Sequence, residues 1–355
     1  MPTYRIAVIP GDGIGNEVTP AAIRALDAVG ERAGIAFEWE YFRWGSDHYF
    51  AHGRMMPEDA LERLRPFDAI LFGAVGDPRL QDNLTLNGLL LPIRRGFDQY
   101  ACVRPAVLYP GVRCPLAGRE PGDIDFIVVR ENTEGEYAQV GGQLYRGGPH
   151  EVAIQSATFT RHGTERVIRF AFDLARRRNK KRLLTSVTKS NAQGFSMEFW
   201  DRVFREVARD YPEIRTESLL VDAACMDLVR RPESFDVLVA SNLFGDILTD
   251  LSAAITGSLG LAPSANLNPE RTFPSMFEPV HGSAPDIAGR GVANPMAAML
   301  AGAMMLDFLT ESTAAARLDA AVRRVLADAS ILTPDLGGRA TTEDVTNAVL
   351  SLLRD

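Results

Sequence analysis

Short apolar runs recur along the chain, and each ends in a polar or glycine-rich turn. Runs of four or five residues predict buried strands at 6–9, 69–72, 126–129, 183–187, 218–221 and 237–240. Apolar residues at helical spacing lie between them and predict helices at 17–29, 164–178, 196–208 and 296–309. This alternation indicates an α/β protein with a largely parallel sheet.

The residues that follow these strands are polar in a way that indicates a functional site. Ligands of such sheets usually bind beyond the carboxyl ends of the strands. Arg130, Lys189 and Asp222 each follow one predicted strand, and Asn242 and Asp246 follow another. The loops richest in Gly and Pro, at 109–122, 141–149 and 262–274, are too short to link independent domains. We therefore expect intertwined domains, with the chain leaving one and returning to it.

A glycine turn follows the first predicted strand but matches neither common nucleotide motif. Residues 11–16 read Gly-Asp-Gly-Ile-Gly-Asn, and the dinucleotide fingerprint needs glycine where Asn16 stands. A P-loop is excluded because no Gly-Lys-Ser/Thr follows. The turn is either a plain strand-to-helix connection or part of a different type of nucleotide site.

Two carboxylates mark a candidate metal site. Asp246 and Asp250 are four residues apart on a predicted helix, so they share one face at the edge of its apolar stripe. Like charges at this spacing weaken a helix by a few tenths of a kcal/mol. A solvated acidic face would also explain them, but Mg²⁺ or Mn²⁺ bound by these hard oxygen ligands would offset the repulsion.

Arginines suit a substrate with more than one carboxylate, because a guanidinium binds a carboxylate through two parallel hydrogen bonds. Arg94, Arg95 and Arg104 lie close together in the sequence, and Arg130 ends a strand. The chain has 38 basic residues, of which three are lysine and 35 arginine, so position rather than type singles these out.

Lys189 and Tyr137 are candidates for proton transfer. Arginine keeps its proton in proteins, whereas a desolvated lysine near other cations can lose it, and Lys189 follows a strand that is predicted to be buried. Tyr137 lies near an arginine that would stabilise its phenolate, so general acid catalysis is plausible. The plain alternatives are a surface lysine and a half-buried packing tyrosine.

Composition limits the binding partners and the cell compartment that we expect. A net charge of −8 argues against general binding to nucleic acid or to anionic membranes. The three cysteines form no CxxC pair, which fits a reducing cytoplasm better than a disulfide framework or zinc ribbon. No apolar stretch reaches the roughly 18 residues of a membrane span, and no export signal is readable.

Taken together, these segments resemble the β-decarboxylating dehydrogenases, the isocitrate/isopropylmalate dehydrogenase family. The strongest matches are 242–250, Asn-Leu-Phe-Gly-Asp-Ile-Leu-Thr-Asp, and 281–289, His-Gly-Ser-Ala-Pro-Asp-Ile-Ala-Gly, in the family's order and spacing. The resemblance implies an isopropylmalate dehydrogenase-like two-domain α/β fold with a mixed parallel/antiparallel central sheet, not a Rossmann fold. Residues 1–100 and 253–355 would form the cofactor-binding domain, and 101–252 the substrate, metal and dimerisation domain.

The resemblance also implies roles for individual residues in a homodimer with shared active sites. Arg94, Arg104 and Arg130 with Leu90 would bind substrate; Asp246 and Asp250, with Asp222 from the partner subunit, would bind Mg²⁺ or Mn²⁺. Lys189 from the partner subunit would be the general base and Tyr137 the general acid. The cofactor would be NAD, since a carboxylate at Asp286 repels the 2′-phosphate of NADP, and K⁺ is a further candidate cofactor. The expected cofactor-binding residues are Ile14, Asn191, Glu278, His281, Gly282, Ser283, Ala284, Asp286 and Asn294.

Within the family, the segments around 88–100 and 264–279 look most like the tartrate/D-malate group. The leucines at 89–91 offer no donors for the third carboxylate of isocitrate, but they could hold an isopropyl group, so 3-isopropylmalate is the alternative substrate. The chain departs from this group at two positions. Asn87 stands where the tartrate-like enzymes often have Trp, and Cys102 stands where an Asn is usual. A non-catalytic regulatory subunit is a further alternative, although the expected base, acid and metal ligands are all present.

Overall fold

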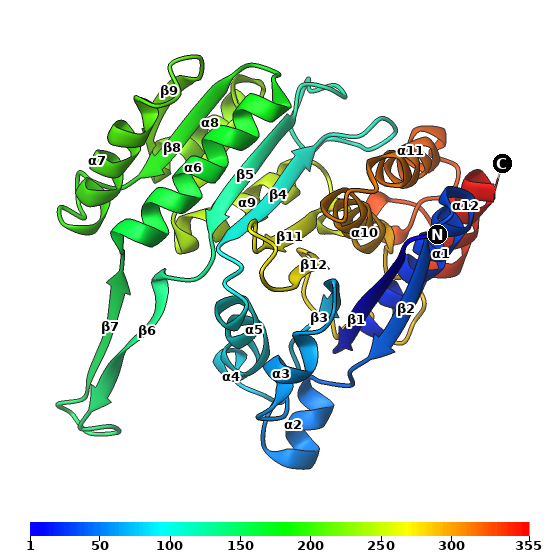
Figure 1. Cartoon of the computed structure of the whole chain (residues 1–355), viewed down its shortest axis with the longest axis horizontal. Helices are drawn as coiled ribbons and strands as arrows, with labels where there is room; N and C mark the ends of the chain where they lie inside the picture. The colour runs from blue at the N-terminus through cyan, green and yellow to red at the C-terminus, as the bar shows by residue number, and fades with distance from the viewer. Residues whose placement is uncertain (355) are drawn as a thin grey trace.

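The computed structural model describes residues 1–354 and is dominated by one ten-stranded sheet that crosses the molecule (Figure 1). The strand order is β2-β1-β3-β12-β11-β4-β5-β10-β8-β9. The strands are β1 (Thr3–Gly11), β2 (Ala36–Tyr41), β3 (Ala69–Ala74), β4 (Ala101–Val107), β5 (Asp125–Glu131), β8 (Leu183–Thr188), β9 (Arg215–Leu220), β10 (Val237–Ala240), β11 (Pro263–Leu267) and β12 (Ser275–Pro279).

The sheet is mixed: most of its strand pairings are parallel, as expected, but its centre is antiparallel. Strands β1, β2, β3 and β12 pair in parallel, and so do β5, β10, β8 and β9. Strands β11 and β4 join these two parallel groups through antiparallel pairings. The first group is built from residues near both ends of the chain and the second from its middle, which is the intertwining expected from the short loops.

Helices pack on both faces of the sheet. The longer ones are α1 (Gly15–Ala33), α6 (Arg161–Arg178), α7 (Ser196–Ala208), α8 (Val221–Arg230), α9 (Asn242–Ile255), α10 (Met296–Phe308), α11 (Ser312–Asp328) and α12 (Thr342–Arg354). Short helices are α2 (Ser46–His52), α3 (Ala60–Leu64), α4 (Asp82–Thr85), the π-helical turn η1 (Leu86–Leu90) and α5 (Leu91–Gly96), with 3₁₀ turns η2 (Pro232–Ser234), η3 (Leu259–Leu261) and η4 (Pro334–Leu336).

Successive residues of a strand point to opposite faces of the sheet, and both faces are covered. The polar side chains of the central strands lie on one of these faces. In β1, Ile6 and Val8 lie in one apolar core, and Ala7 and Ile9 lie in a second core. In β4, Val103 and its alternate neighbours line a hollow beneath α6, α10 and α11. Arg104 points the other way and reaches α9 through Thr249. The central antiparallel strands therefore carry the polar side chains to the α9 face.

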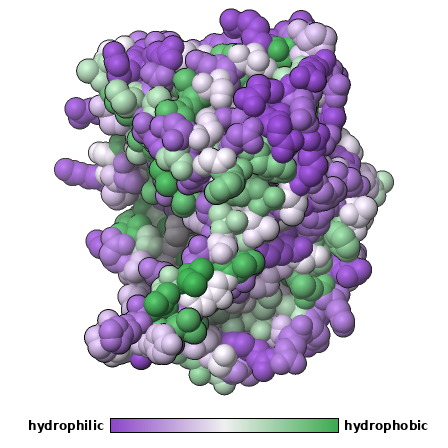
Figure 2. All heavy atoms as spheres, turned by 90° about the vertical axis from the view of Figure 1, so that its left-hand side faces the viewer, coloured by the Kyte–Doolittle hydropathy of each residue, from purple (hydrophilic) through white to green (hydrophobic). Residues whose placement is uncertain are grey.

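A two-stranded arm, β6 (Gly135–Leu144) and β7 (Val152–Thr158), projects from the molecule (Figure 1). Several of its large apolar side chains are exposed, including Leu144 at 58%, Tyr145 at 72% and Ile154 at 56%. Figure 2 views the face toward α7 and the arm and shows green apolar patches among purple polar surface. An exposed apolar arm of this kind is typical of a surface that another chain covers.

All six predicted strands and all four predicted helices are confirmed. The prediction of loops was wrong in two places: Pro263–Leu267 forms the central strand β11, and the start of 141–149 lies in β6. Both segments are rich in Pro, Gly or polar residues, which hide strand character. Within residues 1–354, no helix combines the length and apolar character needed to cross a membrane.

Candidate active site

Two buried arginine side chains converge near the start of α9. Arg104 extends from β4 and Arg130 from the end of β5, and both form ion pairs with Asp246 on α9. Arg130 also donates from Nη2 to Asn242 Oδ1 at 2.7 Å, and Arg104 donates from Nη1 to Thr249 Oγ1 at 2.7 Å. The arginine side chains are only 8% and 2% exposed, so their positive charge is concentrated in a site shielded from water.

Arg94, on α5, lies at the edge of this cluster with one hydrogen-bonding group free. Its Nη2 pairs with Glu278 Oε1 at 2.7 Å, and both side chains are at most 5% exposed. Its Nε is buried and has no partner within the described residues. An unpaired buried donor is costly, so this atom is suited to an acceptor such as a substrate carboxylate.

The local sequence of α9 makes the close approach of Arg130 possible. A Cβ on Gly245 would lie 2.6 Å from Cβ of Arg130, so only glycine fits there. Glu136, from the arm, caps the start of the helix: its carboxylate accepts from Ser241 Oγ at 2.8 Å and from the Leu243 N–H at 3.1 Å. These two features fix Asp246 against the arginines.

Asp246 and Asp250 have opposite electrostatic surroundings. Burial pushes the pKa of Asp246 up, but the Arg130 and Arg104 guanidiniums outweigh it and hold that pKa at about 2. The pKa of Asp250 is raised by burial and by the neighbouring Asp246 carboxylate. No hydrogen bond reaches Asp250 within residues 1–354. Two adjacent carboxylates, one of them without a donor, fit a divalent cation with oxygen ligands.

Tyr137 lies against the same cluster. Its hydroxyl donates to Asp246 Oδ2 at 2.6 Å, and the Arg130 guanidinium carbon lies 5.2 Å from its ring centroid. Burial and the Asp246 carboxylate raise the pKa of Tyr137 to about 12 despite Arg130. The expected arginine does favour the phenolate, but burial and the Asp246 carboxylate have the larger effect on the pKa. The phenol keeps its proton at neutral pH, as a general acid requires.

Lys189 and Asp222 form a separate, more exposed pair. Lys189 Nζ donates to Asp222 Oδ1 at 2.6 Å, and the side chains are 28% and 63% exposed. Within the described residues, no ion pair or hydrogen bond joins them to Asp246, Asp250 or Tyr137. The desolvated, cation-rich surroundings expected for Lys189 are therefore absent from the single chain. Asn191 lies exposed in the same loop.

No group of three or more Asp, Glu, His or Cys side chains able to hold a metal ion exists among residues 1–354. The proposed metal set draws Asp222 from a second subunit, so one chain supplies only Asp246 and Asp250. The chemistry of the pair fits a metal, but the single chain leaves the set incomplete.

The two segments expected to bind the cofactor lie together. The Ile14 N–H donates to Ser283 O at 2.9 Å, and a Cβ on Gly13 (φ +53°) would lie 2.1 Å from that oxygen. His281 Nε2 is buried without a partner in the described residues, and burial lowers the pKa of this imidazole. Gly282 and Asp286 are exposed nearby, and Ala284 has a positive φ of 40°. The glycine turn thus packs directly against the 281–289 loop.

Three other expected site residues are buried, and two of them already form hydrogen bonds within the chain. Glu278 is 4% exposed and also accepts from Asn266 Nδ2 at 2.8 Å, in addition to Arg94. Asn294 donates to Asp335 Oδ2 at 3.0 Å and accepts from the Met296 N–H. Leu90 is 7% exposed, at the end of η1. Glu278 and Asn294 are therefore held by hydrogen bonds to other parts of the chain.

Sequence reasoning missed residues whose partners are distant in the chain. Asp12, 8% exposed, accepts from the Ser46 N–H, the Ser46 hydroxyl and the Gly76 N–H, each within 2.8 Å. Ser264 Oγ accepts from Arg104 Nε at 3.3 Å and lies 3.4 Å from Cys102 Sγ. Alternation of polar residues in β4 and β11 was the available signal, since every second residue of a strand shares one face.

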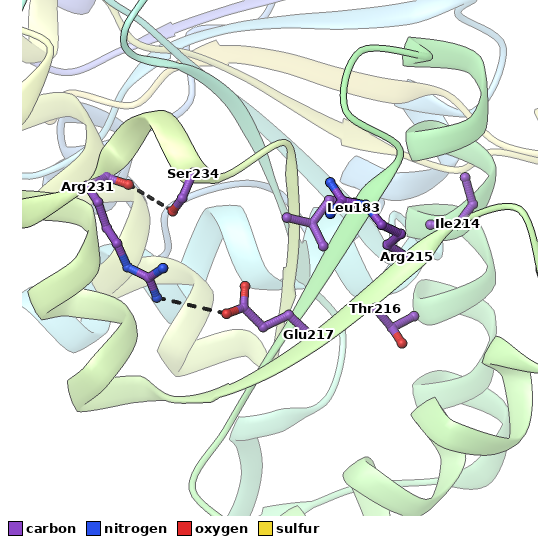
Figure 3. A pocket seen from close by; sticks show the side chains of 7 residues that line it. All are labelled: Leu183, Ile214, Arg215, Thr216, Glu217, Arg231 and Ser234. Carbon is purple, nitrogen blue, oxygen red and sulfur yellow. Dashed lines mark hydrogen bonds and ion pairs between the residues drawn. The ribbon is translucent and has the colours of Figure 1, made fainter.

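A shallow pocket elsewhere carries none of this chemistry. It lies at the amino ends of β8 and β9, between Leu183, Arg215 and Ser234, as Figure 3 shows. Its main charged pair is Arg231 with Glu217 at 3.9 Å. The candidate active site lies at the carboxyl ends of these strands, where Lys189 and Asp222 follow β8 and β9.

Comparisons with known proteins agree with the geometry. The isocitrate/isopropylmalate dehydrogenase family profile matches residues 5–349. The chain is 55% identical over 360 residues to D-malate dehydrogenase [decarboxylating] of Escherichia coli (strain K12), with 99% of each chain covered. It is 51% identical over 359 residues to tartrate dehydrogenase/decarboxylase of Pseudomonas putida, with 99% of this chain and 98% of the relative covered. Isocitrate dehydrogenase from Methylococcus capsulatus superposes with a TM-score of 0.89 at 36% identity, covering 99% and 100% of the two chains.

Proposed function

The chain belongs to the isocitrate/isopropylmalate dehydrogenase family, and from that premise we propose that it oxidises and decarboxylates D-malate or tartrate. The cofactors would be NAD and Mg²⁺ or Mn²⁺, giving a 2-oxo acid, CO₂ and NADH. The observation that carries this proposal is the convergence of Arg104, Arg130 and Tyr137 on Asp246. Arginines beside a metal-binding carboxylate suit a substrate that has two carboxylates and a hydroxyl.

The chain's residues divide the reaction between them. Bound to Asp246 and Asp250, a divalent cation would supply a Lewis acid beside the substrate hydroxyl, and NAD would accept the hydride. Arg94, Arg104 and Arg130 would orient the two carboxylates. Lys189 of the partner subunit would take the hydroxyl proton.

The second stage needs an acid. The 2-oxo acid loses its β-carboxylate as CO₂, and the electron pair of the broken C–C bond remains on the carbon as an enolate. Tyr137 would then donate its phenolic proton to that carbon, forming a C–H bond, and regain a proton from solvent. Its raised pKa of about 12 keeps the proton available at neutral pH.

We also propose a homodimer whose two active sites are shared. Exposed apolar side chains on α8 and α9 support this: Met226 is 57%, Val229 44% and Ile247 48% exposed. Ile247 lies directly after Asp246, so a chain covering it would approach the metal-binding carboxylates. Burying such a patch is favourable at about 25 cal/mol per Å². Lys189 and Asp222 of the partner subunit could then complete the site.

The domain division proposed from the sequence assigns residues 1–100 and 253–355 to cofactor and 101–252 to substrate, metal and dimer contacts. Strands β4 and β11 cross that boundary by pairing with each other. Free Cys102, Cys114 and Cys225 support a reducing cytoplasmic location.

Cofactor preference follows from the exposed carboxylate of Asp286 in the 281–289 loop. Such a carboxylate can accept hydrogen bonds from the ribose hydroxyls of NAD and would repel the phosphate of NADP. The 3-isopropylmalate alternative depends on the leucines around Leu90, which is buried and apolar.

The test is a set of initial rates with D-malate, both tartrate isomers, 3-isopropylmalate and isocitrate, each with NAD and with NADP. We expect NADH formation from D-malate or tartrate that requires Mn²⁺ or Mg²⁺. Turnover that survives exhaustive chelation would overturn the metal assignment. Activity confined to 3-isopropylmalate would replace the substrate assignment, and complete inactivity of well-folded protein would favour the regulatory-subunit alternative.

A further inference from the structure

The stretch of β6 that carries Tyr137 is held partly by residues outside its own hairpin. In the β6–β7 ladder Gly135 pairs with Thr158 and Val140 with Ser156, and the register shifts between these two points. Residues 136–139 therefore lack regular cross-strand partners. Backbone groups outside a ladder must find other partners, and the position of such a segment depends on them.

Side chains provide two such backbone partners and one further contact. Arg95 Nη2 donates to the backbone carbonyl of Tyr137 at 2.6 Å. Gln155 Nε2 donates to the Ala138 carbonyl at 2.5 Å, and Gln139 Nε2 donates to Asn87 Oδ1 at 2.5 Å. Two of these three contacts, those of Arg95 and Asn87, come from the segment formed by η1 and α5.

That same segment faces the substrate site. Leu90 ends η1, and Arg94 and Arg95 are consecutive on α5. Arg94 turns inward to Glu278, while Arg95 is half-buried and turns to the arm. Figure 1 shows α5 beside the base of the arm. One short helix therefore contacts both the substrate clamp and the strand that carries the acid.

Tyr137 is consequently held at both ends. Its hydroxyl donates to Asp246, and its carbonyl accepts from a guanidinium, a charge-assisted bond stronger than a neutral one. If only the hydroxyl were bound to Asp246, the strand and the ring could pivot about that hydrogen bond. The second contact fixes the phenol relative to α5, and so relative to the substrate that Arg94 would hold.

We propose that Arg95 is a positioning residue that sets Tyr137 for proton transfer to the enolate carbon, an inference that rests on the proposed function of Tyr137 as the acid. The tyrosine O–H bond breaks, the C–H bond forms, and the enolate becomes the 2-oxo acid. Arg95 donates to the backbone throughout and exchanges no proton. Asn87 and Gln139 add a second, uncharged contact between the same two segments.

The experiment isolates the proton-transfer step by running it backwards. Exchange of the methyl hydrogens of pyruvate for solvent deuterium, with Mn²⁺ present, is followed by NMR for the wild type, Arg95→Met, Arg95→Lys and Tyr137→Phe. Arg205→Met serves as the matched control, since this arginine on α7 is 65% exposed and distant from the site in sequence and fold. The kcat and KM for D-malate and the unfolding transition are measured for each protein.

We expect Arg95→Met to slow exchange and kcat by roughly tenfold to a hundredfold, the size expected for a misplaced catalytic group, with KM changed far less. Arg95→Lys, which keeps a cationic donor, should recover most of the loss, and Arg205→Met should match the wild type. Unchanged exchange in a folded Arg95→Met protein would overturn the proposal, as would a rise in KM alone, which would make Arg95 a substrate ligand. Normal exchange in Tyr137→Phe would instead refute the acid assignment in the proposed function.

Discussion

The two halves of the candidate site differ in how complete they are within one chain. Asp246 has three donors, Arg104, Arg130 and Tyr137, and its arginines are almost fully buried. Within residues 1–354, Lys189 and Asp222 have no ion-pair partner other than each other, and the Asp222 side chain is 63% exposed. The first half is preorganised by the fold, whereas the second is open to solvent in the single chain.

The difference in burial determines how much free energy it costs to break each half. A carboxylate among buried guanidiniums needs all of its partners, because an unpaired buried charge is costly. An exposed ion pair contributes only about 0–1 kcal/mol and can exchange partners at little cost. The exposed pair can therefore be separated at little cost, as our proposal of a shared site requires, whereas separating the buried cluster would be costly.

The largest expected effect concerns the exposed half. Lys189→Met should lower turnover by roughly 10²–10⁴-fold, the contribution of a positioned general base, while NAD binding and folding stay near the wild type. The measurements are kcat with D-malate and binary NAD binding by fluorescence. Near-normal turnover would remove Lys189 from the chemistry.

A substitution in the buried half should disturb stability as well. Arg130→Met removes a guanidinium from Asp246 and Asn242, and we expect a loss of about 2–3 kcal/mol in the free energy of unfolding, the range for hydrogen bonds to charged groups. Denaturant unfolding at fixed protein concentration measures it. A variant as stable as the wild type would contradict the view of this cluster as preorganised.

The acid should be visible by its titration. With its pKa raised to about 12 by burial and Asp246, Tyr137 should release no proton until well above the ordinary tyrosine value near 10. Ultraviolet difference titration of the wild type against Tyr137→Phe measures this. Arg130→Met should raise the pKa further, because Arg130 favours the phenolate. A phenolate from Tyr137 at pH 9 would contradict the assigned surroundings.

The smallest effect belongs to the exposed ion pair. Asp222→Asn should leave the free energy of unfolding close to that of the wild type, as is usual for exposed pairs. The same variant should bind Mn²⁺ much more weakly, by calorimetry, if Asp222 is a metal ligand of the partner's site. Unchanged Mn²⁺ affinity would exclude that role.

The sequence was sufficient for features with a local signal. The apolar runs correctly predicted six of the strands. The helical spacing around Asp246 and Asp250 correctly predicted that both lie on one helix, α9. The antiparallel strand β11 was not found, because Pro263 and Pro269 bound the segment and prolines are typical of loops, although Ser264 and Asn266 alternate with apolar residues as in a strand.

Long-range contacts escaped prediction for a related reason. Asp246 lies 109 residues from Tyr137, and burial together with this carboxylate raises the pKa of the phenol against the opposing effect of Arg130. Arg95 gave no signal of its contact with the Tyr137 carbonyl, since a backbone acceptor leaves no pattern in side-chain types. Such effects depend on the folded sheet and arm rather than on spacing along the chain.

The most direct test of the shared site is subunit complementation. Lys189→Met and Tyr137→Phe proteins, each inactive alone, are mixed under conditions that allow subunit exchange, and D-malate oxidation is measured. If each site combines Tyr137 of one subunit with Lys189 of its partner, half of the mixed dimers are hybrids with one intact site, and about a quarter of wild-type activity should return. If both residues act within one chain, every site carries a lesion, and the absence of any recovery despite proven exchange would contradict the shared site.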